Sequence, residues 1–195
     1  MSRHLLIAGA ALAALSLSAC NKASEPTAPP AEKAAVPDAA PAATIPTPAN
    51  EAAAPDFVAK AAASDMFEIE AAKLAQARSK NADVKAFAQM MTTAHTKSTA
   101  DLKKAISDAN QAITPPATLP QPLQDKLADL SKVDAAGFDK AYMSGQVDAH
   151  QDTLNLMQRY AQDGDVAQIK AFATATGPVV QTHLDRAKVI RDALK

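Results

Sequence analysis

Apolar residues in the C-terminal two thirds of the chain recur every three or four positions, the spacing of one helical face. One stretch reads Val84, Phe87, Ala88, Met91, His95, Ser98, Leu102, Ala105 and Ala109. A second reads Met143, Val147, His150, Leu154, Met157 and Ala161. A third reads Ile169, Phe172, Ala173, Thr176, Val180, His183, Ala187, Ile190 and Leu194. Each face includes one histidine, so the pattern predicts that three imidazole rings point into a common interior.

Glycine and proline are scarce after Pro55, and β-branched residues do not alternate with polar ones. This composition predicts an all-α domain. Asp56 and Asp165 are predicted N-caps, Asn81 marks a break between helices, and Pro178 is expected to kink the last helix. The long helices are predicted over about residues 56–80, 82–110, 134–162 and 165 to the C-terminus.

The connections between the predicted helices indicate a topology. The joints at Asn81 and Gly164 are short, whereas about 25 residues separate the second and third long helices. That long connection contains one short predicted helix, residues 123–131, bordered by prolines. One long crossover is typical of a ferritin-like four-helix bundle, in which helices two and three run parallel. The three histidines then lie within about one or two helical turns of the same level.

The N-terminal region differs in composition from the rest of the chain. Arg3 and an apolar run precede Leu17-Ser18-Ala19-Cys20, which reads as a secretory signal with a bacterial lipobox. Cys20 is the only cysteine, and it stands at the lipidated position of that motif. Proline and alanine dominate the next segment, which cannot bury a core. The predicted division is a signal peptide at 1–19, a lipidated cysteine and disordered tether at 20–55, and a folded domain at 56–195.

Location and partners follow from the same features. Asn21 after the cysteine resembles the sorting signal that directs Gram-negative lipoproteins to the outer membrane. We therefore expect the protein on the periplasmic side of that membrane, attached through its lipid. The chain has 20 basic and 21 acidic residues, so no positive field attracts nucleic acid. No protein partner is indicated.

Three inward histidines suggest a metal site, because one ion can satisfy a nitrogen of each buried ring. On the first helix one apolar face turns Glu70 inward, and a competing face turns Glu68 inward instead. The predicted ligands are His95, His150, His183 and Glu70, around one zinc, copper or iron ion. Inward methionines are soft ligands that favour copper, but they are equally typical of an ordinary core. The alternative is a metal-free core in which each histidine hydrogen-bonds to a polar neighbour.

The sequence lacks the residues that several kinds of catalysis require. A ferritin-like di-iron centre requires Glu-x-x-His on two helices, but Thr92 and Val180 stand three residues before His95 and His183. Motifs for haem attachment, phosphate binding and covalent catalysis are absent from the sequence. A metal storage, sensing or stress-protection module is therefore favoured over an enzyme. The alternative is a metal-free interaction or structural module of the cell envelope.

Several short motifs resemble the bacterial domain-of-unknown-function 4142 family. They are Asp56-Phe57-Val58, Phe67-Glu68-Ile69-Glu70, Val84-Lys85-Ala86-Phe87-Ala88, His95-Thr96-Lys97, Phe138-Asp139-Lys140-Ala141-Tyr142-Met143, Gln146-Val147 with His150, and Pro178 with His183-Leu184. The resemblance spans about residues 55–195. It implies an exported, often envelope-attached, ferritin-like four-helix protein without an established activity. It also implies that Glu70, His95, His150 and His183 correspond to a glutamate and three histidines that recur in the family.

Overall fold

The computed structural model describes residues 52–194, and this part of the chain contains helices and no strands. Its helices are α1 (Ala54–Arg78), α2 (Ala82–Asp108), α3 (Gln121–Lys132), α4 (Phe138–Asp163) and α5 (Ala167–Ala193). In that range none of them combines the length and the apolar character that a membrane span requires. The predicted signal peptide, Cys20 and nearly all of the predicted tether lie outside the described residues.

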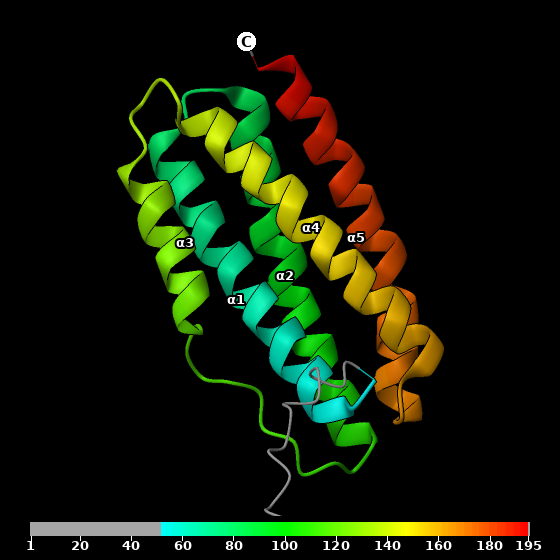
Figure 1. The fold of residues 1–195 in the computed structure, drawn as a ribbon. Coiled ribbons are helices and arrows are strands. Elements are labelled where there is room, and N and C mark those ends of the chain that lie inside the picture. Colours follow the sequence, from blue (N-terminus) through cyan, green and yellow to red (C-terminus); the bar gives the residue numbers. More distant parts are fainter. Residues whose placement is uncertain (1–51, 195) are drawn as a thin grey trace, which may run out of the picture. The chain divides into compact units, whose positions relative to one another are not determined.

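Four long helices lie side by side, and the shorter α3 lies against the outside of α1 (Figure 1). Helices α1 and α2 form one antiparallel pair, and α4 and α5 form another. Between the pairs, the chain returns along α3 before it begins α4, so α2 and α4 run in the same direction (Figure 1). Each of the four long helices therefore contributes one face to a shared interior.

The helix bounds agree with the predicted ones to within a few residues, and the differences have local causes. Helix α1 begins before Asp56, with Pro55 in its first turn. Helix α4 begins later than predicted, because the Asp134 side chain accepts a hydrogen bond from Gly137 N (2.7 Å) in a separate turn. Pro178 lies inside α5 without ending it. Asn81 caps α2.

Asp165 has a different role from the predicted one. Helix α5 begins at Ala167 with Val166 as its N-cap, and no side chain caps it. The Asp165 Oδ1 atom instead accepts hydrogen bonds from Ala54 N (2.9 Å) and from the Tyr160 hydroxyl (3.0 Å). The joint between α4 and α5 is thereby attached to the first turn of α1.

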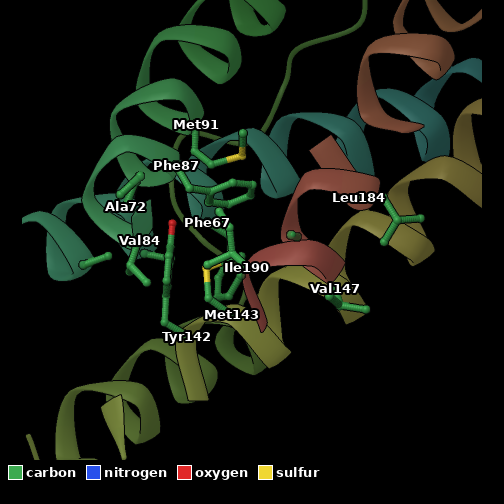
Figure 2. Close-up of a cluster of buried hydrophobic side chains, with 14 of the residues drawn as sticks. Phe67, Ala72, Val84, Phe87, Met91, Tyr142, Met143, Val147, Leu184 and Ile190 are labelled. Carbon is green, nitrogen blue, oxygen red and sulfur yellow. The ribbon is translucent and has the colours of Figure 1, made fainter. Parts of the chain in front are cut away.

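Two apolar clusters fill the interior. We name the one that includes the start of α1 the near core: Ala54, Phe57, Val58, Ala61, Ala62, Leu102, Ala105, Ile106, Leu156, Met157, Tyr160, Ile169, Phe172 and Ala173. We name the other the far core: Phe67, Ala71, Ala72, Ala75, Val84, Phe87, Ala88, Met91, Phe138, Tyr142, Met143, Val147, Leu154, Val180, Leu184, Ala187 and Ile190. Figure 2 shows the far core, with side chains from α1, α2, α4 and α5.

Buried polar residues lie within or next to the far core. On α2, His95 stands between Met91 of the far core and Leu102 of the near core. On α4 and α5, His150 and His183 each stand between far-core residues, Val147 and Leu154 for His150 and Val180 and Leu184 for His183. We name the buried set Asp65, Glu68, His95, His150 and His183 the polar layer.

Candidate metal centre

The three histidines meet in the polar layer. Their exposed fractions are 5% for His95, 1% for His150 and 6% for His183. The ring centroids are 5.7 Å apart for His95 and His150, 6.0 Å for His95 and His183, and 5.6 Å for His150 and His183. One nitrogen from each ring lies within 4.8 Å of the others. The prediction that three helices direct these rings into one interior is confirmed.

A carboxylate on α1 orients His95. Its Nδ1 donates to Asp65 Oδ1 over 2.8 Å, and both side chains are buried. The second carboxylate oxygen of Asp65 accepts from the Thr99 hydroxyl over 3.1 Å. Because a carboxylate only accepts, Nδ1 carries a proton, and in the neutral form of the ring the lone pair is therefore on Nε2. The buried His95 Nε2 has no hydrogen-bond partner.

The other two rings also present a nitrogen without a partner. His150 Nδ1 donates to the Gln146 carbonyl one turn earlier on α4 (2.8 Å), and its buried Nε2 has no partner. His183 Nδ1 is buried and unpartnered as well. Buried polar atoms are nearly always hydrogen-bonded in proteins. The three exceptions, on three converging helices, form a group that could hold a metal ion.

The prediction that Glu70 points inward is wrong. Its side chain is 47% exposed and forms an ion pair with Lys73 Nζ at 2.7 Å. The buried glutamate is Glu68, on the competing face that also carries Phe57 and Ala61. Alanine occurs on every side of α1, so its apolar pattern does not select one face.

Glu68 lies beside the histidine cluster. Its Oε1 atom is 3.9 Å from His150 Nδ1, and neither carboxylate oxygen has a hydrogen-bond partner. Within residues 52–194, the ligand atoms that come together are those of the three histidines, and Glu68 is outside that group. Glu68 is therefore a carboxylate next to the centre and not one of its grouped ligand atoms.

Burial dominates the electrostatics of the site. It raises the pKa of Glu68 to about 7, against the lowering effect of His95. Burial, with the charge of His95, lowers the pKa of His150 to about 3 and that of His183 to about 4. Burial also opposes a charge on His95, but the hydrogen bond to Asp65 and the charges of Glu68 and Asp65 raise its pKa overall. His150 and His183 are thus neutral at pH 7, the form that binds metals.

The three rings fit a transition-metal ion. Nitrogen ligands about 2.0–2.1 Å from a tetrahedral zinc ion lie about 3.3 Å from one another. Nitrogen atoms within 4.8 Å of one another reach that spacing by small side-chain rotations. Imidazole binds zinc, copper and iron, and three protein ligands leave one coordination position open.

The sequence reasoning missed several polar residues around the site. Asp65 and Thr99 hold His95, and their roles depend on a contact between α1 and α2. Tyr142 and Gln146 are buried and each has an oxygen without a partner. Tyr142, Gln146 and His150 follow one another at intervals of four residues, and this spacing is the signal that identifies a polar stripe on the inward face of α4.

Comparison with known proteins places the chain in a family. Neither the curated proteins nor the solved structures give a match. The family model described as "Domain of unknown function (DUF4142)" matches residues 39–190. That range includes the whole polar layer and all the residues that contact it through hydrogen bonds. The chain therefore belongs to the DUF4142 family.

Proposed function

We propose that the folded domain binds one transition-metal ion, zinc, copper or iron, through His95, His150 and His183. The observation that carries this proposal is the set of three buried, unpartnered ring nitrogens within reach of a single ion. A metal-free network would satisfy these atoms by hydrogen bonds at about 3 Å. The nitrogens lack such partners, which favours an ion as the group that satisfies them.

The residues around the rings support this role. Asp65 and the Gln146 carbonyl accept the Nδ1 protons of His95 and His150, the arrangement that fixes ring orientation in metal sites. An ion held here has an open position for water or a small ligand. Thr92, in the place of a bridging glutamate, bonds to the Ala88 carbonyl on its own helix. We therefore assign the domain to metal storage, sensing or stress protection and not to di-iron oxygen chemistry.

The proposal extends to the cellular context and the topology. We propose that the four long helices form a ferritin-like bundle with its long crossover between α2 and α4. We further propose that Cys20 carries the lipid of an outer-membrane lipoprotein and that residues 20–55 tether the domain on the periplasmic side. Replacing the attachment atom, in Cys20→Ser, is expected to abolish fatty-acid labelling of the membrane fraction. Equal labelling of variant and wild type would refute the anchor.

Calorimetric titration of tag-free, metal-free protein with zinc, copper and iron tests the metal site. One ion per chain is expected, with a rise in melting temperature that follows RT ln(1 + [L]/Kd). Alanine at His95, His150 or His183 is expected to weaken binding by about one to several orders of magnitude. The three effects should be strongly non-additive, since loss of one ligand already breaks the site.

A wild-type protein that neither retains nor binds these metals would overturn the metal proposal. In that case each alanine variant should only destabilise the metal-free fold, by about 1–3 kcal/mol. The remaining candidate would be a metal-free interaction module of the cell envelope.

A further inference from the structure

The charges around the three histidines indicate which class of ion they take. Two carboxylates of the polar layer, Asp65 and Glu68, have exposed fractions of 4% and 1%. Each of them lies beside a histidine ring: Asp65 Oδ1 is 2.8 Å from His95 Nδ1, and Glu68 Oε1 is 3.9 Å from His150 Nδ1. Buried carboxylates are unfavourable unless a positive charge compensates them. When both carboxylates are ionised, the layer thus has two negative charges and three rings that are uncharged when they bind a metal.

We propose that Asp65 and Glu68 balance the charge of a divalent cation and so make the site favour a divalent over a monovalent metal ion. This inference rests on the proposed metal site. Neutral imidazoles add no charge, so a divalent ion and two carboxylates form an electrically neutral unit. A monovalent ion leaves one negative charge uncompensated in an interior where charges are weakly screened.

Glu68 is the residue that makes the inference testable. Asp65 is held by hydrogen bonds from His95 and Thr99 whether or not an ion is present. Neither oxygen of Glu68 has a hydrogen-bond partner within bonding distance, and the neighbours that favour the charged form of this carboxylate are His95 and the Gln146 side chain. A further positive charge nearby would stabilise it. Because Glu68 lies outside the group of ligand atoms, its effect on an ion acts through charge and not through a coordination bond.

Zinc(II) and copper(I) form a matched pair of probes. Both have a filled d shell and both accept imidazole ligands, but they differ by one unit of charge. The substitution Glu68→Gln keeps the shape of the side chain and removes its negative charge. Because the Coulomb energy is proportional to the charge of the ion, we expect it to weaken zinc(II) binding by about 10- to 100-fold and copper(I) binding by about 3- to 10-fold, the square root of that factor. Affinities are measured at about pH 8 by competition with chromophoric chelators, without oxygen for copper(I).

The chain offers matched controls. Glu70→Gln removes a carboxylate from the exposed side of the same helix, where it pairs with Lys73, and should change neither affinity. His183→Ala removes a ligand and should weaken both ions strongly. Asp65→Asn, a second charge-removing variant, also loosens His95. It should therefore weaken both ions, but zinc(II) by a further factor of about ten.

The decisive quantity is the ratio of zinc(II) affinity to copper(I) affinity, compared between each variant and the wild type. Equal losses of zinc(II) and copper(I) in Glu68→Gln would overturn the charge inference while leaving the metal site intact. If Glu68→Gln does not fold, the same ratio in Asp65→Asn supports or overturns the inference. Wild-type protein that binds neither of these ions nor iron would refute the proposed metal site itself, and this result is recognised without the variants.

Discussion

Tyr142 and Tyr160 lie on the same helix and are both fully buried, but the two ends of the bundle accommodate them differently. In the near core, Tyr160 stacks on Phe57 with ring centroids 4.1 Å apart, and its hydroxyl donates to Asp165 Oδ1. In the far core, Tyr142 lies edge-on to Phe87 with centroids 6.4 Å apart, and its hydroxyl has no partner. Figure 2 shows that oxygen directed toward the part of the far core that holds Ala72.

The two tyrosines show that the near core satisfies its buried polar group, whereas the far core, which adjoins the candidate site, does not. The near core satisfies its buried hydroxyl and uses the same Asp165 oxygen to bind the first turn of α1. The far core borders unpartnered oxygens of Glu68, Tyr142 and Gln146. Unsatisfied buried groups cost stability, and natural proteins retain them mainly at functional sites.

The largest expected effects come from two substitutions that each create a cavity, one in the near core and one in the far core. Phe57→Ala in the near core and Phe87→Ala in the far core are each expected to lower the free energy of unfolding by about 3–5 kcal/mol. The Phe87 ring is 6.2 Å from the His150 ring, so only its loss should also weaken zinc binding. Chemical denaturation and calorimetric titration measure the two effects. A similar loss of zinc affinity in both variants would show that the site is not confined to one side of the bundle.

A second test removes one carboxylate from each region. Asp65→Ala leaves His95 Nδ1 without an acceptor, whereas the Thr99 hydroxyl retains the His95 carbonyl. Asp165→Ala removes the side-chain acceptor of both Ala54 N and the Tyr160 hydroxyl. Each should cost about 1–3 kcal/mol in the metal-free protein. Only Asp65→Ala should reduce zinc affinity, and Asp65→Asn should reduce it less because the amide oxygen still accepts from His95. Unchanged zinc binding in Asp65→Ala would contradict its role in orienting the ring.

The pH dependence of stability provides a third test. The pKa of His150 falls from an ordinary value of 6.5 to about 3, so between these values the unfolded chain binds a proton that the folded chain does not. This contribution makes the metal-free protein less stable as the pH falls. His150→Gln should therefore make the loss of stability shallower, by up to about 1.4 kcal/mol per pH unit.

Glu68 contributes with the opposite sign. Its pKa rises from 4.5 to about 7, so the folded chain retains a proton that the unfolded chain has released, and stability falls as the pH rises through that window. Glu68→Gln should accordingly steepen the loss of stability on acidification from about pH 6.5 to about pH 4.5. Denaturation midpoints at several pH values measure both slopes. Parallel curves for wild type and both variants would contradict the burial of these groups.

The smallest expected changes in stability come from removing the hydroxyl groups of Tyr160 and Tyr142. Tyr160→Phe should cost about 1 kcal/mol, because it removes a hydrogen bond to Asp165. Tyr142→Phe should change stability by less than about 0.5 kcal/mol, since its hydroxyl has no partner to lose. Thermal or urea denaturation distinguishes them. An equal cost for Tyr142→Phe would mean that its hydroxyl gains a partner in solution, such as a bound water.

The periodicity of the sequence was sufficient to predict the helices and the inward direction of three histidines. On α2, α4 and α5, large apolar side chains such as Phe87, Val147 and Ile169 contrast with polar neighbours and define one face. A ring that falls on such a face is buried when the face packs. The same method was wrong on α1, where alanines on all sides define no single apolar face and Glu70 was favoured over the buried Glu68.

Contacts between residues distant in sequence were decided only by the tertiary structure. Asp65 meets His95 across 30 positions, and Asp165 meets Ala54 across 111, although local pattern marked Asp165 as the cap of its own helix. A helical period specifies which face of a segment is apolar, because it depends on neighbours three or four residues away. It carries no information about which atom of another helix will lie opposite. That pairing depends on how the four helices pack together, and it determines which polar groups are satisfied and which remain free to bind an ion.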